Sequence, residues 1–456
     1  MVFRNAMIRS TYGLDQDNAM RHIEQRCAGC GELAPFEDHL VNCPSCGRGA
    51  LLVSQYYSSC DMRGPDDAFW SYRSWLPYEN VLKIRGPRIG CMMASALGAA
   101  IGISDLWVVF SGYSPRHGST FVTGTFKECE AIGVLNRVRE QTNRLLIVSS
   151  AGNAGRAFLE LGARHNEPAV VVLPERAEPH ITLSDLPDFA PLLILIRDAY
   201  YPDAIRFVDR AINDFPEQLV REGGCYNVAR RDSMAVPFLR AVRAMGRLPD
   251  RYVQAVGSGT GAIAAWESSQ RLISFGLVPN QAMRLLLVQN SPFAPMVDAW
   301  INGKDNVASI SEKEMREQLS QTYARVLSNA TPPYGVRGGV RDALMASRGG
   351  MQAVSNEEIQ AAQEMAANLL EFVPCNAASA ALAGLIKAAK NGEVQRDEKV
   401  LLHLTGGGMS ELERDLGGYS YMRSITVDLG DPAPALAAIR AYLGKVASAY
   451  KVPEER

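Results

Sequence analysis

The sequence predicts an α/β protein built from two doubly wound lobes, each a mostly parallel sheet covered by helices. Short apolar runs typical of strands alternate with amphipathic runs typical of helices, which is the pattern of parallel βαβ units. The chain has 456 residues, too many for one ordinary core and suitable for two lobes and an appendage. In such folds, ligands bind at the carboxyl ends of the strands.

The predicted strands are apolar and end at small residues or proline, and helices separate them. Strands are predicted over 105–110, 144–148, 169–173, 251–256, 283–289 and 399–404, and helices over 128–140, 155–164 and 262–272. A strand over 424–428 and a helix over 434–449 form a C-terminal tail. We therefore expect an extension (1–23), a four-cysteine segment (24–58), a larger lobe (59–118 and 241–416), a smaller lobe (119–240) and the tail (417–456).

The composition excludes several kinds of protein. Hydrophobic residues make up 47% and charged residues 21%, as in ordinary globular proteins. The formal net charge of −2 gives no general attraction to nucleic acid or to an anionic membrane. No apolar run approaches the roughly 20 residues that span a bilayer, and the polar N-terminus lacks the apolar region of a signal peptide. We expect a cytoplasmic protein without nucleic-acid or membrane partners.

Four of the nine cysteines form two C-x2-C pairs separated by 12 residues. This spacing is typical of a zinc ribbon, in which four thiolates hold Zn2+ and leave no open position, so we expect a structural metal. The alternative is four unrelated thiols. Zinc ribbons often bind nucleic acid, but only Arg26 and Arg48 could contact phosphates here, which disfavours that role. The four candidate ligands are Cys27, Cys30, Cys43 and Cys46.

One lysine stands in an unusual setting. Lys127 follows the run Thr123-Gly124-Thr125-Phe126 and occupies the first turn of its predicted helix. Backbone N–H groups and the helix dipole disfavour a cation at that end, which suits a lysine that acts as a Schiff-base nucleophile. Taken alone, a lysine in a helix is far more often a solvated surface group.

Two loops of small residues follow the lysine. In the first, residues 149–155, glycines flank Asn153 and let a ligand approach the backbone closely. The second, residues 256–262, opens a helix, so its N–H groups and the helix dipole favour an anion. NAD is one alternative for this loop, but the next strand ends in Gln289-Asn290 and lacks the acidic residue that binds ribose. We favour a bare phosphate, and a purely structural turn is the other alternative.

The order of lysine, asparagine loop and glycine loop resembles that of the threonine synthases and their relatives, which are fold-type-II enzymes similar to the tryptophan synthase β chain. Several stretches resemble more specifically the cysteate synthases, an offshoot of that group that serves coenzyme M and sulfonate biosynthesis. The resemblance runs from about residue 70 to about residue 410. The stretches that carry it are 110–113, 124–128, 150–158, 227–231, 254–261, 330–334, 373–380 and 404–408.

The resemblance implies pyridoxal 5′-phosphate as cofactor and a role for each matching position. Lys127 would hold the cofactor as an internal aldimine and then carry the proton from the substrate Cα. Asn153 would bind the 3′ oxygen of the cofactor, and Thr405 would meet its pyridine nitrogen. The cofactor phosphate would lie on Gly257, Ser258, Gly259, Thr260 and Gly261, and the substrate carboxylate on Ser150, Ala151 and Gly152.

The implied reaction is a β-replacement on O-phospho-L-serine. Phosphate would leave, an aminoacrylate would remain, and sulfite would add to give L-cysteate. Sulfite is already nucleophilic near neutrality, so no catalytic histidine is required, and the six histidines of the chain stand in no motif. Two anions require cationic donors. The candidates are Arg156, Arg230 and Arg231, with Arg116-His117 as a weaker option.

Three alternatives stay open at this point. The first is a related β-substitution that uses another nucleophile, and the second is a threonine synthase acting on O-phospho-L-homoserine. The third is a zinc-ribbon regulator with a degenerate enzyme body, which the intact Lys127, Asn153 and Thr405 disfavour. Because relatives in this group are commonly dimers, we also expect a homodimer.

Overall fold

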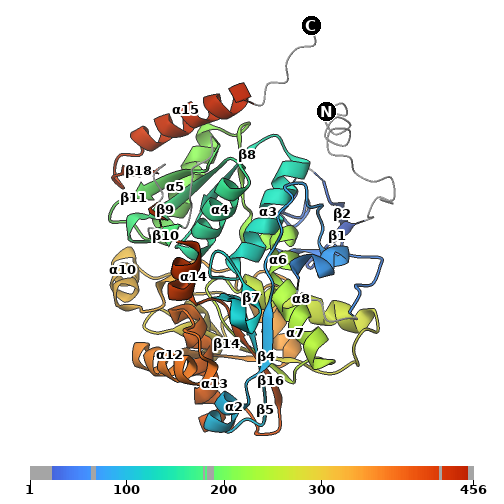
Figure 1. The fold of residues 1–456 in the computed structure, drawn as a ribbon. Helices are drawn as coiled ribbons and strands as arrows, with labels where there is room; N and C mark the ends of the chain where they lie inside the picture. The colour runs from blue at the N-terminus through green and yellow to red at the C-terminus, as the bar shows by residue number, and fades with distance from the viewer. Residues whose placement is uncertain are drawn as a thin grey trace.

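The computed structural model describes residues 23–449 except 38, 63–67, 178–179, 182–188, 418 and 421–423 (Figure 1). The predicted N-terminal extension, apart from its last residue, lies outside the described residues, as do residues 450–456 of the tail. No helix in the described ranges is long and apolar enough to cross a membrane. The predicted lobe boundaries stay a prediction, and the strands form two larger sheets.

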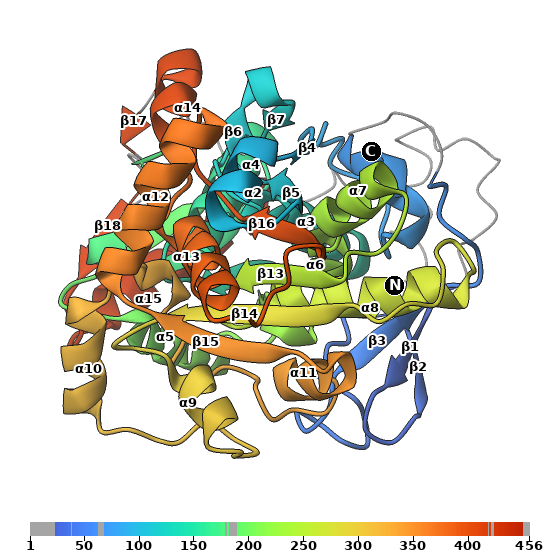
Figure 2. The same ribbon diagram turned by 90° about the horizontal axis from the view of Figure 1, so that it is seen from below.

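The larger sheet has six strands in the order β15-β14-β13-β16-β5-β4. Its strands are parallel except for the antiparallel edge strand β4. Figure 2 shows β13 and β14 lying between α13 on one side and α8 and α11 on the other. The bounds are β4 (Gly90–Met93), β5 (Asp105–Phe110), β13 (Arg251–Ala255), β14 (Arg284–Asn290), β15 (Gly350–Val354), β16 (Lys399–Leu404), α8 (Thr260–Ser274), α11 (Val340–Ser347) and α13 (Asn376–Lys390).

The smaller sheet has five parallel strands in the order β12-β8-β9-β11-β18. Its central strands are apolar along their whole length because helices cover both faces, as expected of a buried parallel sheet. The bounds are β8 (Leu145–Ser149), β9 (Ala169–Pro174), β11 (Leu192–Ile196), β12 (Leu219–Arg221), β18 (Ser424–Val427), α3 (Lys127–Gln141), α4 (Asn153–Arg164) and α5 (Tyr201–Asp214).

The C-terminal tail is built into this smaller sheet. Strand β18 pairs in parallel with β11, with Ile425 opposite Ile194. Helix α15 (Ala433–Ala449) then lies across the same end of the molecule (Figure 1) and buries Ile439 and Tyr442 in the core shared with β11 and α5. The tail was predicted as a strand and a helix. The strand adds to the edge of the smaller sheet, and the helix packs against β18 and β11.

The four-cysteine segment forms its own antiparallel sheet in the order β2-β1-β3 and packs against the body of the protein. Arg231 of α6 donates to the carbonyl oxygen of Leu52, and the Ser54 hydroxyl donates to Asp232 over 2.6 Å. Buried hydrogen bonds therefore fix the four-cysteine segment to the rest of the protein. The bounds are β1 (Glu24–Cys27), β2 (Leu33–Pro35), β3 (Leu52–Gln55) and α6 (Val228–Met234).

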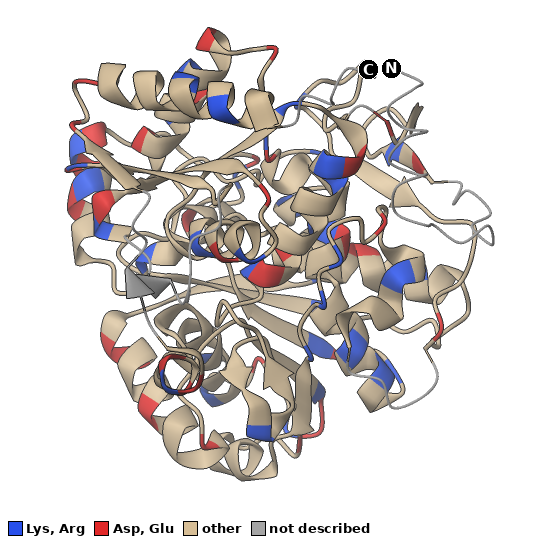
Figure 3. Cartoon of the chain, turned by 45° about the horizontal axis from the view of Figure 1, so that its top comes forward, with Lys and Arg blue, Asp and Glu red and all other residues tan. Residues whose placement is uncertain are grey.

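The remaining elements cover the sheets or border the loops. Basic and acidic side chains are interspersed over them (Figure 3), in keeping with the net charge of −2. The elements are α2 (Ser95–Ile101), β6 (Tyr113–Ser114), β7 (Ser119–Thr120), β10 (His180–Ile181), α7 (Val236–Met245), α9 (Pro295–Ile301), α10 (Glu312–Gln321), α12 (Asn356–Leu370), α14 (Met409–Leu416), β17 (Tyr419–Ser420) and the short 3-10 turns η1 (Phe69–Trp75), η2 (Pro115–His117), η3 (Glu175–Ala177), η4 (Gly224–Tyr226) and η5 (Arg325–Leu327).

Candidate active site

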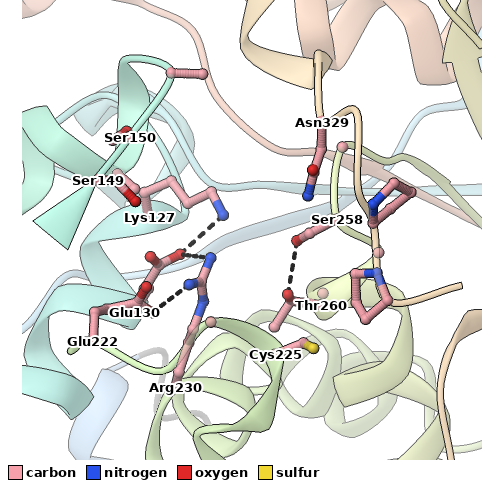
Figure 4. A pocket seen from close by; sticks show the side chains of 18 of the residues that line it. Lys127, Glu130, Ser149, Ser150, Glu222, Cys225, Arg230, Ser258, Thr260 and Asn329 are labelled. Carbon is pink, nitrogen blue, oxygen red and sulfur yellow. Dashed lines mark hydrogen bonds and ion pairs between the residues drawn. The ribbon is translucent and has the colours of Figure 1, made fainter. Parts of the chain in front are cut away.

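A cavity of about 420 Å³ lies where the carboxyl ends of strands from both sheets meet (Figure 4). Its wall includes the residues that follow β8 and β12 in the smaller sheet and those that follow β13 and β16 in the larger sheet. This is the position predicted for a ligand site in a doubly wound fold. The sequence-predicted residues on the wall are Lys127, Ser150, Ala151, Gly152, Asn153, Arg230, Gly257, Ser258, Gly259, Thr260, Gly261 and Thr405.

The turn before Lys127 is joined by backbone hydrogen bonds to the loop after β16. The N–H of Phe126 donates to the carbonyl of Thr405 over 3.0 Å, and the N–H of Gly407 donates to the carbonyl of Gly124 over 2.9 Å. Gly124 has a φ of +66°, and a Cβ there would lie 2.6 Å from the sulfur of Met409. Glycine at this position therefore lets the lysine turn pack closely against the loop that carries Thr405.

Lys127 opens α3 and belongs to a buried cluster of alternating charges (Figure 4). Its Nζ lies 2.9 Å from Oε2 of Glu130, and the same oxygen lies 3.0 Å from the guanidinium of Arg230. Arg230 also pairs with Glu222. Oε1 of Glu130 and Nε of Arg230 are buried without a hydrogen-bond partner in the described residues, so the cluster retains polar atoms for a ligand.

Burial shifts the proton affinities of this cluster. It lowers the pKa of the Lys127 amine from its ordinary value, although Glu130 opposes the shift. Burial also raises the pKa of Glu222, although Arg230 opposes it. Burial works against the charge of Arg230, but Glu130 and Glu222 outweigh it, and the pKa of the guanidinium rises. Lys127 is thus more easily deprotonated than an exposed lysine, which a Schiff-base nucleophile requires.

Glu130 and Glu222 were not predicted from the sequence. Glu130 follows Lys127 by three residues on one helix, and residues at that spacing share a face, so its position was a usable signal. Glu222 follows β12, and nothing in its local sequence connects it with Lys127. The smaller sheet brings β12 beside β8, and this topology brings Glu222 to the cavity.

The glycine loop, residues 257–261, begins the 15-residue helix α8. Gly259 has a φ of +78°, and a Cβ there would lie 2.2 Å from Val340. The hydroxyls of Ser258 and Thr260 lie 2.8 Å apart on the cavity wall. A helix N-terminus with free N–H groups and two hydroxyls fits a phosphate. These features fit the phosphate of pyridoxal phosphate, with Lys127 on the opposite wall (Figure 4).

A dinucleotide fits this loop less well. In a dinucleotide fold, an acidic residue at the end of the next strand binds the ribose. Here Gln289 occupies that end, and its Oε1 accepts the N–H groups of Met296 and Val297 over 2.9 and 3.2 Å. The amide oxygen therefore caps α9, and a neutral amide stands where a dinucleotide site has a carboxylate.

The asparagine loop lies on the cavity wall and is ordered by Ser150. The Ser150 hydroxyl accepts the N–H groups of Gly152 and Gly155 over 3.0 and 2.9 Å. Gly152 adopts a φ of +146°, a conformation that L side chains rarely adopt. Asn153 is the first residue of α4, and Thr405, which follows β16, lines the same cavity. Lysine, asparagine, threonine and glycine loop therefore share one cavity.

The three predicted anion-binding arginines do not share one position. Arg230 lies in the cavity but is neutralised by two carboxylates. Arg156 donates to the carbonyl of Thr123 and lines a second cavity of about 270 Å³ behind the asparagine loop. The side chain of Arg231 is fully buried, pairs with Glu267 and lines neither cavity. The weaker candidate Arg116 pairs at the surface with Glu371.

The four cysteines of the paired motif lie together. Their sulfur atoms are all within 4.8 Å of one another. The N–H groups of Gly29 and Cys46 point to the sulfurs of Cys27 and Cys43 over 3.4 and 3.3 Å. Burial raises the pKa of the Cys27 thiol, but backbone hydrogen bonds from Cys30 and Gly29 outweigh burial and lower it to about 7. The set fits a tetrahedral metal ion held by four thiolates.

Comparison with known proteins agrees with this geometry. The chain is a pyridoxal-phosphate dependent enzyme, since the family of that description matches residues 94–406. A cysteate synthase from Methanospirillum hungatei JF-1 is 40% identical over 413 residues, which cover 90% of this chain and 96% of the relative. One from Methanoregula boonei is 38% identical over 415 residues, 91% and 96% of the two chains. The chain belongs to the cysteate synthase family of pyridoxal-phosphate dependent enzymes.

A solved structure with a similar fold is the threonine synthase of Escherichia coli. It matches with a TM-score of 0.52 and 15% identity, over 75% of this chain and 79% of that chain. At this identity, the likeness concerns the fold alone. It confirms the predicted fold-type-II architecture.

Proposed function

We propose that this enzyme replaces the phosphate of O-phospho-L-serine by sulfite and so forms L-cysteate and inorganic phosphate. The observation that carries the proposal is the cavity in which Lys127 faces the glycine loop and which Asn153 and Thr405 also line. The relatives described above, which are named cysteate synthases, support the choice of reaction. During the reaction, the Cβ–O bond to phosphate breaks and a Cβ–S bond to sulfite forms.

We assign the following roles to residues that line the cavity. Pyridoxal phosphate, when bound, withdraws electrons from the substrate Cα and so makes its proton acidic. Lys127 holds the cofactor and accepts this proton, a task that the burial-lowered pKa of its amine supports. Glu130 orients the amine through its contact of 2.9 Å. The hydroxyl of Thr405 meets the pyridine nitrogen, and Asn153 binds the 3′ oxygen.

The remaining contacts position the anions. The glycine loop binds the phosphate of the cofactor, and the N–H groups and hydroxyl of residues 150–152 bind the substrate carboxylate. Sulfite attacks with its own lone pair and needs no base to remove a proton. In keeping with this, no histidine is found among the described residues that line the cavity. Cys225 lines it, but burial raises the pKa of its thiol to about 12, so the group stays neutral.

The test is an assay of the purified enzyme with defined substrates. With O-phospho-L-serine and sulfite, we expect stoichiometric release of phosphate and a product with the mass of cysteate. Sulfide, thiosulfate and amines should replace sulfite poorly, and O-phospho-L-homoserine should release no phosphate. Turnover of O-phospho-L-homoserine alone would identify a threonine synthase, and turnover with another nucleophile alone would identify a different β-substitution.

We also propose that the four clustered thiols hold one Zn2+ that stabilises the segment around them. The spacing of the sulfurs and the N–H donors to them support this assignment. Metal analysis should find about one zinc ion per chain, and Cys43→Ser should lose it and unfold at a lower denaturant concentration. Cys91→Ser, which changes a thiol outside the cluster, should keep the metal. A metal-free enzyme of unchanged stability would contradict the proposal.

A further inference from the structure

The four-cysteine segment reaches the active site through one side chain. Arg48 stands two residues after Cys46 and lines the same cavity as Lys127. Its guanidinium carbon lies 4.8 Å from the centre of the Tyr226 ring, which also borders the cavity. An element outside the two sheets of the enzyme therefore contributes a cation to the cavity wall.

The backbone around Arg48 is held from two sides. The Tyr226 hydroxyl donates to the carbonyl of Arg48 over 3.0 Å. The N–H of Gly49 donates to the carbonyl of Cys46 over 3.1 Å, and the N–H of Arg337 donates to Gly49 over 3.1 Å. The cysteine turn and the body of the enzyme thus fix the start of this side chain. Arg48 is an exposed residue and borders the cavity.

Arg48 differs from the other cations on the wall by its charge balance. Among the described residues that line the cavity, the cations are Lys127, Arg48, Arg221 and Arg230. Lys127 and Arg230 are paired with buried glutamates, and Arg221 is paired with Asp209. Arg48 has the Tyr226 ring beside it and no carboxylate partner within the described parts of the chain. It is the cation whose charge is available to a ligand.

We propose that Arg48 binds the oxyanion that reacts in this cavity, the substrate phosphate or the incoming sulfite, and thereby selects for it. This inference rests on the proposed function, in which the substrate carries a phosphate of charge about −1.5 to −2 at pH 7. The glycine loop is occupied by the phosphate of the cofactor in that scheme, so the substrate phosphate needs another partner. A planar guanidinium can donate two parallel hydrogen bonds to such an anion, and the Tyr226 ring keeps its plane in place. Sulfite, the second anion, has the same recognition chemistry.

The experiment compares three variants of the holoenzyme by steady-state kinetics. For Arg48→Ala, we expect the KM for the bound oxyanion to rise about tenfold or more, because a charge-assisted hydrogen bond is lost. Arg48→Lys should fall between this variant and the parent, since lysine keeps the charge but loses the paired geometry. Arg26→Ala is the matched control, because Arg26 is exposed on the same segment, donates to Gly31 and lies outside the cavity wall.

The pattern of KM values identifies the anion. A rise for O-phospho-L-serine alone assigns Arg48 to the substrate phosphate, and a rise for sulfite alone assigns it to the nucleophile. An unchanged KM for both anions, with unchanged kcat, would overturn the proposal. The yellow absorbance of the bound cofactor should be the same in all three variants, which separates loss of anion binding from loss of the cofactor.

A binding measurement keeps this test independent of the reaction. Inorganic phosphate titrated calorimetrically into the holoenzyme should bind about tenfold more weakly to Arg48→Ala than to Arg26→Ala. If the parent fails to turn over O-phospho-L-serine but this difference is found, the proposed function is wrong and the anion site stands. Equal phosphate affinity in both variants removes the anion site, whatever the enzyme turns over.

Discussion

The Lys127→Ala variant is expected to lose the yellow absorbance of the bound cofactor and about 1000-fold or more of the rate of phosphate release. The reason is that one side chain both holds the cofactor and moves the Cα proton, and a positioned acid–base group alone contributes about 100- to 10,000-fold. Absorbance spectra of the purified variant and single-turnover phosphate release measure the two losses separately.

The fold should survive this substitution. Glu130 keeps its contact of 3.0 Å with Arg230 when the lysine amine is removed, so no buried carboxylate is left alone. The denaturation midpoint should therefore stay close to that of the parent protein without cofactor. Lys313→Ala, on the exposed face of α10, is the control and should keep both colour and rate. A coloured, active Lys127→Ala enzyme would contradict the assignment of the lysine.

Arg231→Ala is expected to lower the free energy of unfolding by about 3–5 kcal/mol, as removal of one partner of a buried ion pair does. Its guanidinium bonds Glu267 over 3.0 and 3.1 Å and also donates to the carbonyls of Cys225 and Leu52. All three acceptors would lose a buried partner. Denaturant titration measures the loss, and the matched surface variant Arg414→Ala should change stability by no more than about 1 kcal/mol.

The loss of unfolding free energy in Arg231→Ala should also depend on pH. Burial raises the pKa of Glu267 even with its arginine present, and the pKa rises further when the arginine is removed. A carboxyl whose folded pKa lies above its unfolded pKa destabilises the fold as the pH rises through the folded value. The deficit of Arg231→Ala should therefore be larger at pH 8 than at pH 5. A variant of normal stability with a raised KM would instead restore Arg231 as an anion-binding residue.

Much of the larger sheet could be predicted because its strands are apolar runs whose ends are visible in the local sequence. The strands over 105–110 and 399–404 agree with the structure to the residue, since each is an apolar run with a clear end. Strand β11, with the sequence Leu-Leu-Ile-Leu-Ile, was not predicted, although it lies between β9 and β18 in the smaller sheet. A short apolar run can belong to a strand or to a buried helix, and only its neighbours in space decide between them.

The prediction of the site was limited in the same way, because neighbours in space decide the role of some residues. Lys127, Asn153, Thr405 and the glycine loop were predicted from distinctive local motifs, and the structure brings them into one cavity. Arg231 also lies in a matching stretch, residues 227–231, but it pairs with Glu267, whereas its neighbour Arg230 pairs with Glu222. Consecutive helical residues are turned by about 100° from each other, so two adjacent arginines rarely serve one ligand. Roles that depend on the partner side chain need the tertiary structure.

The pairing of β18 with β11 has a consequence for synthesis of the protein on the ribosome. Strand β11 is complete at residue 196, but the strand that covers its edge begins at residue 424. The nascent chain therefore carries an uncovered apolar strand while most of the second half of the protein is made, and such edges pair readily with other chains. The edge closes only after residues 424–427 have been made.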